Sequence, residues 1–516
     1  MPVPIKFFSN EGYFAVITAT SDLMTVMTYG FKSESLIKQI EVSADNAMTF
    51  LDSVATIFDA SKCKAIILDI FSFKPTGFSH VMIFAQELRC KFADNKLCNF
   101  FYSGENLFNS GMLVSAKIKS SKNDSILCIR VGTDQLYVFK YIFTDMGYDL
   151  IRENLYEEVD KESSFKLREK ILRGTNPKHI IVYGEDLDAP IMRKLKKVVF
   201  FNETINLLDG KMLKESVAKS KSISKFVSDR SIVKYHINNA RCQKDFAVYL
   251  DDMKNPLFVV QAGETLPVHN VDCVRRSADK LFVCSFDEDT KEKRIIFIHK
   301  LEDGGQNCHR KRITFFVDKE SFPSIQSVPI ILDVIKQLPQ KLDETYAKKI
   351  PVIVFRDTYS VICAVKKGQR GYSFLDGWNG IYGHDDAMFV KKSQQLYGFE
   401  ATKMKKLKPN HTLTNMLEIM SQTDLSAIED PVFCKDYFKE HTSFKRGYDR
   451  EDIVCFYMTK FLEEHFKVIH DETGVSVDEV GFYIEFPEKQ KIVIEARFLK
   501  SFKTFDIHPH LLDLPK

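Results

Sequence analysis

Residues 65–71 read Ala-Ile-Ile-Leu-Asp-Ile-Phe, an almost continuous apolar run. Such a run is typical of a strand that is buried on both faces, in the middle of a parallel or mixed sheet. Just before it, apolar residues recur between positions 47 and 58 with the spacing of one helix face, after a candidate N-cap at Ser43. We therefore predict a helix over 43–58 that leads into a buried strand.

Further strands are predicted on both sides of this unit, over the ranges 14–20, 24–29, 126–131, 136–142 and 179–184. The last of them ends at Gly184 and precedes a predicted helix over 191–197, a layout typical of α/β nucleotide-binding cores. The connecting turn, 184–190, is acidic, so carboxylates would point at any phosphate there. The charged segment 154–173 is predicted to be helical.

The pattern changes after a Ser/Lys-rich stretch at 215–235, which predicts the end of a helix and a linker. Short strands separated by turn residues then follow between positions 246 and 317. Their spacing predicts a compact all-β domain of about 80 residues.

From about position 350 the opening pattern returns. Residues 352–365 form a predicted strand pair, and a helix after Asp449 leads to a strand over 482–486. The segments 14–90 and 350–505 therefore share an element order, which indicates an internal duplication with an insert at about 371–440. A single lobe would expose its apolar face, so we expect residues 1–230, of this chain or a second one, to cover the tail's apolar helix stripe, made of Val454, Met458, Phe461 and Leu462.

The composition is that of an ordinary globular protein: of 516 residues, 44% are hydrophobic and 28% charged, and the net charge is +3. These values exclude a disordered chain and argue against a nucleic-acid-binding polycation. The eleven cysteines include no C-x-x-C pair, so we expect free thiols in a reducing compartment and no metal site. No signal peptide or membrane-spanning run is recognisable, which predicts a cytoplasmic or nuclear protein without membrane partners.

Several segments, in the same order along the chain, resemble the heat-shock-seventy chaperone family. The unit at 41–73 resembles the family's helix and V-T-V-P-A-Y-F strand, and 180–194 is similar to its adenosine-side segment. Residues 257–267 and 313–318 are similar to strands of its peptide-binding sandwich. In the tail, 357–365 resembles its first phosphate loop.

The resemblance implies an α/β fold with a degenerate actin-like ATPase-type core, an all-β sandwich domain and a C-terminal α/β lobe. The implied domains are an abridged nucleotide-binding-type domain at 1–230, a peptide-binding-type sandwich at 240–328, a linker or lid-like helix at 329–348, and a second partial actin-like lobe at 350–516.

The residues that the family uses for ATP hydrolysis are mostly replaced. The positions of the metal-side Asp and the second Gly of the first loop fall on Val16 and Thr18, and the Glu of a further motif falls on Tyr102. We therefore expect no catalytic residues, no ATPase activity and no resident cofactor; Mg²⁺-ATP would bind weakly, if at all, at a vestigial site that consists of Thr20, Gly132, Thr133 and Gly184.

The peptide-pocket positions of the family fall on Tyr249, Val274 and Ser285, with Arg275 and Arg276 nearby to make the cleft more polar. The expected function is binding of polypeptide clients or chaperone partners without an ATP cycle. Two alternatives remain open: a divergent but active ATP-dependent chaperone, and a structural interaction protein that binds no peptide.

Overall fold

The computed structural model describes residues 11–159, 161–210, 217–238, 240–251, 253–287, 290–301, 307–391, 394–408, 411–423 and 450–513. The chain is mixed α/β with several sheets. It divides into two compact units: unit 1 holds 1–270, 282–299 and 315–324, and unit 2 holds 271–281, 300–314 and 325–516. Asp449, before the predicted tail helix, lies outside the described residues, as does Cys434, one of the eleven cysteines.

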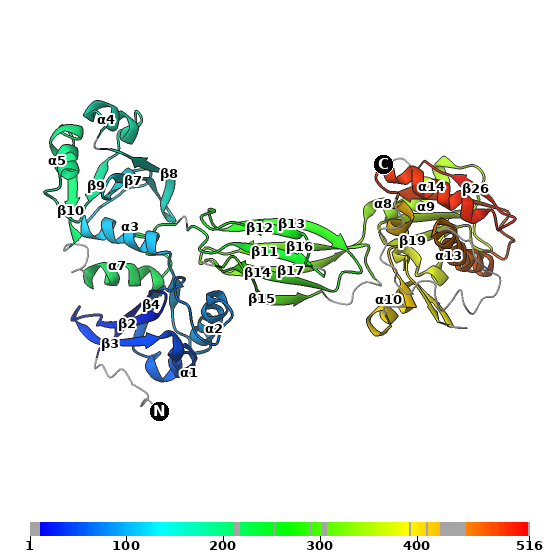
Figure 1. Cartoon of the computed structure of the whole chain (residues 1–516), viewed down its shortest axis with the longest axis horizontal. Helices are drawn as coiled ribbons and strands as arrows, with labels where there is room; N and C mark the ends of the chain where they lie inside the picture. The colour runs from blue at the N-terminus through cyan, green and yellow to red at the C-terminus, as the bar shows by residue number, and fades with distance from the viewer. Residues whose placement is uncertain are drawn as a thin grey trace. The chain divides into compact units, whose positions relative to one another are not determined.

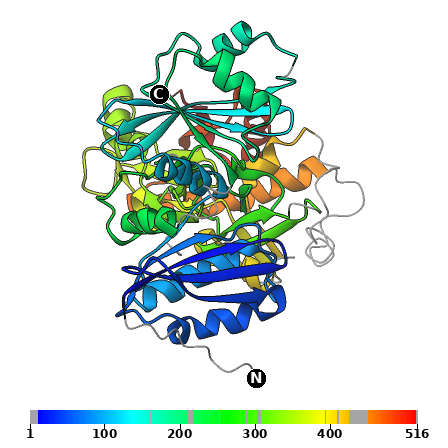
Figure 2. The same cartoon turned by 90° about the vertical axis from the view of Figure 1, so that its left-hand side faces the viewer.

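The first sheet of unit 1 has the order β3-β2-β1-β4-β5. Its strands are β1 (Tyr13–Ala19), β2 (Leu23–Gly30), β3 (Leu36–Ser43), β4 (Cys63–Asp69) and β5 (Asn99–Phe101). Figures 1 and 2 show this sheet in blue between helix layers, with α7 (Val217–Ser228) on one side and α1 (Ala47–Ile57) on the other. Two helix layers explain why β4 is apolar on both faces.

The second sheet of unit 1 has the order β10-β9-β6-β7-β8. Its strands are β6 (Ser125–Val131), β7 (Gln135–Thr144), β8 (Gly147–Glu157), β9 (His179–Tyr183) and β10 (Ile205–Leu208). Helix α3 (Gly104–Ser115) lies on one face, and α4 (Ser164–Leu172), α5 (Pro190–Lys194) and a π-helix (Leu195–Val199) pack on the other. Helix α2 (Val81–Asp94) completes the helices around the first sheet.

The all-β segment contributes a four-stranded sheet of order β12-β11-β14-β15 and a three-stranded sheet of order β13-β16-β17. The strands are β11 (Phe246–Leu250), β12 (Pro256–Val260), β13 (Val268–Arg275), β14 (Lys280–Phe286), β15 (Lys293–Lys300), β16 (Arg310–Val317) and β17 (Pro323–Ile330). Within unit 1, the rings of Phe258 and Phe315 join the two sheets by stacking, with centroids 6.0 Å apart. Strand β17 was not predicted, because its alternating polar residues carry little apolar signal.

Unit 2 is built around a sheet of order β20-β19-β18-β25-β26. Its strands are β18 (Val352–Arg356), β19 (Tyr359–Ala364), β20 (Ser373–Phe374), β25 (Glu479–Glu485) and β26 (His508–Leu511), and β21 (His384–Asp385) pairs with β19. Helices α13 (Arg450–Thr473) and α14 (Glu488–Phe502) cover one face, and α8 (Asp333–Lys336) and α9 (Leu338–Thr345) cover the other.

Further elements of unit 2 lie between β19 and α13. They include two 3₁₀ turns (Asp376–Trp378 and Gly380–Tyr382), a small sheet of β22 (Met388–Lys391), β23 (Gln394–Tyr397) and β24 (Thr412–Leu413), and the helices α10 (Gly398–Leu407) and α11 (Met416–Ser421).

The three mixed sheets share one strand order and one set of strand directions. In each sheet, the first three strands along the chain form an antiparallel meander. The fourth strand pairs in parallel with the first, and the fifth pairs in parallel with the fourth. The predicted shared element order of 14–90 and 350–505 is therefore confirmed. The same order in the second sheet of unit 1 was not predicted.

Three local predictions were wrong. Residues 154–157 of the predicted helix belong to β8, and α4 begins only at Ser164. Ser43 ends β3 and precedes a short 3₁₀ turn (Ala44–Asn46), with no side-chain cap. The tail's apolar stripe is also buried inside unit 2 itself, packed with β18, β25 and α14, so the reason for expecting a cover from residues 1–230 disappears.

Candidate functional site

A cavity of about 810 Å³ lies in unit 1, beside the second sheet. Three segments form it: the first turn of α3, the turn between β6 and β7, and the turn between β9 and α5. Three of the four residues predicted for a vestigial nucleotide site line it together, namely Gly132, Thr133 and Gly184.

Thr20, the fourth predicted residue, is not among the residues that line this cavity. It is exposed and forms the tight turn between β1 and β2, where its amide and its hydroxyl both donate to the carbonyl of Leu23. The preceding positions Val16 and Thr18 lie within β1 and pair with both neighbouring strands. The structure therefore has a plain hairpin here, with no glycine to bring the backbone close to a phosphate.

The lining of the cavity includes one cationic side chain, that of Arg130, near the end of β6. Its guanidinium carbon lies 5.0 Å from the ring centroid of Phe108, 5.1 Å from that of Tyr137 and 5.3 Å from that of Phe139. Three rings at this range hold the guanidinium by cation–π attraction. These three aromatic rings hold the side chain of Arg130 against the sheet.

The lining of the cavity includes more acidic side chains than basic ones. Glu105, Glu185 and Asp186 line the cavity. Burial raises the pKa of Glu105, the nearby Glu153 raises it further, and Arg130 acts in the opposite direction. Three carboxyl groups against one guanidinium make the cavity unfavourable for a phosphate chain.

Asp69, which the sequence analysis did not single out, lies close to the same helix start. Burial raises its pKa to about 6. A Cβ on Gly104 would lie 2.9 Å from Oδ2 of Asp69, so a larger residue there would have to displace this carboxylate. In the sequence, Asp69 could be noticed only as the one acidic residue inside the apolar run at 65–71.

The residues predicted to line a peptide cleft are buried. Tyr249 is 6% exposed, Val274 5% and Ser285 fully buried. The hydroxyl of Ser285 donates to the carbonyl of Asp245 at 2.7 Å, and the ammonium of Lys293 lies 3.6 Å from the ring centroid of Tyr249. Neither the cavity beside the second sheet nor a smaller one lined by residues 71–75 and 78–81 includes any of these three residues. Their role in peptide binding stays a prediction.

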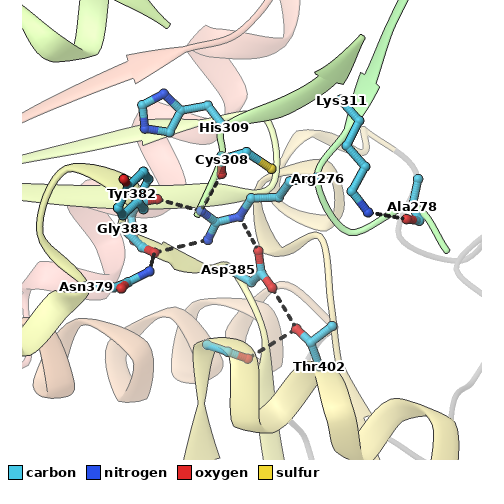
Figure 3. A network of polar contacts seen from close by, with 12 residues as sticks. Arg276, Ala278, Cys308, His309, Lys311, Asn379, Tyr382, Gly383, Asp385 and Thr402 are labelled. Carbon is cyan, nitrogen blue, oxygen red and sulfur yellow. Dashed lines mark hydrogen bonds and ion pairs between the residues drawn. The ribbon is translucent and has the colours of Figure 1, made fainter. Parts of the chain in front are cut away.

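Arg276, expected beside that cleft, has a different place. Its side chain is 2% exposed and lies inside unit 2, where Nε donates to Oδ1 of Asp385 at 2.5 Å (Figure 3). The guanidinium also donates to the carbonyls of Cys308, Tyr382 and Gly383. The second carboxylate oxygen of Asp385 accepts from Thr402. Arg276 therefore joins the end of β13 to the turn before β21.

The neighbouring Asp386 is fully enclosed. Burial raises its pKa well above the usual range, the negative Asp385 acts in the same direction, and Arg276 opposes both. Its amide donates to the carbonyl of Thr358 at 2.7 Å, which fixes the turn.

Gly383, in the same turn, provides a direct test of this packing. Its φ is +62°, and a Cβ there would lie 2.0 Å from the carbonyl oxygen of Ser360. The ψ of −178° places Gly383 in a backbone region that is essentially restricted to glycine. We expect Gly383→Ala to destabilise unit 2 by more than the 1–3 kcal/mol or so of backbone strain alone, because the clash adds to the strain. Thermal unfolding followed by Trp378 fluorescence measures it.

Gly368→Ala is the matched control, since Gly368 has a φ of +81° and nothing within 4 Å of the added Cβ. Equal losses in the two variants would contradict the close contact at Gly383.

No protein-family model matches the chain, and a search of curated proteins finds no significant match. Among the described residues, no helix is both long and apolar enough to cross a membrane. The same residues contain no group of three or more His, Cys, Asp or Glu side chains that could hold a metal ion. The ten cysteines described are free thiols.

Proposed function

We propose that this chain is a heat-shock-seventy-like protein that binds polypeptide clients or partner proteins and has no ATP cycle. The observation that carries the proposal is the order of its parts. Two sheets of identical strand order are followed by an all-β segment, and a third sheet of the same order ends the chain. An actin-like core followed by a sandwich is what the family resemblance implies. Free thiols fit the reducing compartment expected for such a protein.

The chemistry of the cavity supports the absence of an ATP cycle. Phosphoryl transfer depends on metal-bound carboxylates and on backbone groups that surround the phosphates. Here Val16 and Thr18 occupy strand positions in place of the family's Asp and Gly, and Glu185 and Asp186 face the cavity. A phosphate chain in this cavity would meet the negative charge of these two side chains.

We expect the purified protein to release no phosphate from Mg²⁺-ATP above the background rate. A steady-state phosphate-release assay measures this, with Gly132→Asp as the matched variant, because an added carboxylate in the cavity would repel nucleotide further. Turnover in the wild type that disappears in Gly132→Asp would refute the proposal and favour the active, ATP-dependent chaperone.

One observation favours a second candidate, a structural interaction protein that binds no peptide. The side chains expected to line the peptide cleft, Tyr249, Val274 and Ser285, are buried. A client would need either an opening of these strands or another surface of the all-β segment.

A further inference from the structure

Strand β15 forms one edge of the four-stranded sheet in the all-β segment. The sheet order is β12-β11-β14-β15, and no other described strand pairs with the outer side of β15. An edge strand offers a row of backbone N–H and C=O groups to any extended chain that reaches it. Edges of soluble proteins are usually short, bulged or interrupted by proline. Strand β15 runs for eight residues, Lys293–Lys300, and contains no proline.

The side chains of β15 also fit an added strand. The middle reads Ile-Ile-Phe-Ile, and Ile295 and Ile298 are 39% and 50% exposed. These two positions lie on opposite faces, because side chains alternate along a strand. An added strand would cover apolar surface on both faces of the edge, in addition to pairing its backbone.

We propose that β15 is the binding site for an extended polypeptide segment, which adds as a fifth strand to this sheet. The segment is aliphatic in its middle and acidic at its ends. The inference rests on the proposed function and specifies its site, and it needs no opening at Tyr249, Val274 or Ser285. Backbone pairing would supply affinity, and alternate side chains would supply selectivity.

Charge distinguishes this occupant from a second copy of the chain. Both ends of β15 carry cationic side chains: Lys293 and Arg294 begin it, and Lys300 ends it. Arg294 is also paired with Glu292, and Lys293 donates to the carbonyl of Met253. In an antiparallel pair of two β15 strands, the basic start of one would lie opposite the basic end of the other, and like charges in that position are destabilising. Acidic ends on a client meet opposite charge instead.

The first test uses the peptide backbone. The probe is a fluorescent peptide of about eight residues, with valines between terminal aspartates, and anisotropy measures its binding to the full chain. An edge strand bonds to only every second residue of its partner. Of two N-methylated probes, one methylated at odd and one at even positions, we expect one to bind at least roughly tenfold more weakly and the other to bind as before.

The second test uses the protein. Ile298→Glu places a charge in the aliphatic centre of β15, and we expect it to weaken the probe at least roughly tenfold. Val259→Glu is the matched control, because Val259 is 49% exposed on β12 at the opposite edge of the same sheet. We expect this control to bind the probe as the wild type does.

The outcomes separate the two proposals. A probe that binds equally in both methylated forms and to Ile298→Glu would overturn the β15 site while leaving polypeptide binding intact. A plain probe that does not bind at all would overturn both. Concentration-dependent dimers that disappear in Ile298→Glu would assign the edge to a second copy of the chain.

Discussion

Replacing Arg276 by alanine lowers the free energy of unfolding of unit 2 by about 3–5 kcal/mol, since it leaves the buried carboxylate of Asp385 without its partner. The ion pair is enclosed, with side-chain exposures of 2% and 7%. Three backbone carbonyls lose a charged donor as well. Urea unfolding followed by the fluorescence of Trp378 measures the change. This tryptophan is the only one in the chain and lies buried in unit 2.

Arg310→Ala is the control for this prediction. Arg310 pairs with Asp357 in the same unit, but both side chains are about one third exposed, at 34% and 32%. Exposed pairs contribute about 0–1 kcal/mol, so this variant should unfold close to the wild type. Equal losses in the two variants would show that Arg276 does not hold a buried charge.

The second large effect is a loss of stability of unit 2 in acid, caused by His465. The imidazole is fully buried, with Nε2 2.9 Å from the hydroxyl of Ser360 and Nδ1 2.8 Å from the carbonyl of Phe461. Burial lowers the pKa of His465 to about 3. An unfolded chain has a histidine pKa of about 6.5, so below that pH it binds a proton that the folded unit excludes.

Stability from His465 is therefore present above about pH 6.5 and is lost as the pH falls towards the folded pKa of about 3. At ~1.4 kcal/mol per pH unit, we expect His465 alone to contribute a loss of about 2.5 kcal/mol between roughly pH 7 and pH 4.5. Asp386 acts in the opposite direction, because burial raises its pKa and the folded unit therefore binds a proton that the unfolded chain releases. His309, whose pKa burial lowers to about 4, adds to the loss in the same range. Urea unfolding by Trp378 fluorescence at both pH values measures it.

In His465→Gln the part of the acid loss that belongs to His465 should disappear, because glutamine does not titrate. The variant is less stable at neutral pH, so the comparison concerns the difference between the two pH values. An unchanged pH difference in His465→Gln would refute the assignment.

Buried strands were predictable because their sequences are continuous apolar runs. Both β4 and β18 are covered on two faces by helices, and each shows this in its composition. Strand β8 was not predictable in this way, since it lies at the edge of its sheet and mixes exposed charged residues with apolar ones. In a sequence that mixture resembles a solvated helix.

The candidate site was predictable only in part. A glycine at the end of a predicted strand pointed to Gly184, and the family resemblance pointed to Gly132; both line one cavity. The burial of Arg276 was beyond reach, because its partners Tyr382, Gly383 and Asp385 lie more than a hundred residues further along the chain. Two adjacent arginines in a sequence normally indicate a solvated surface.

We propose that polypeptide binding by this chain does not depend on nucleotide. Titration calorimetry of the full chain with an extended aliphatic peptide, in the presence and absence of Mg²⁺-ATP, tests it most directly. We predict that the peptide binds with the same Kd in both conditions and that Mg²⁺-ATP alone gives no binding heat. Coupled sites change each other's affinity by the same factor. A peptide Kd that shifts by about fivefold or more with Mg²⁺-ATP would therefore contradict the account.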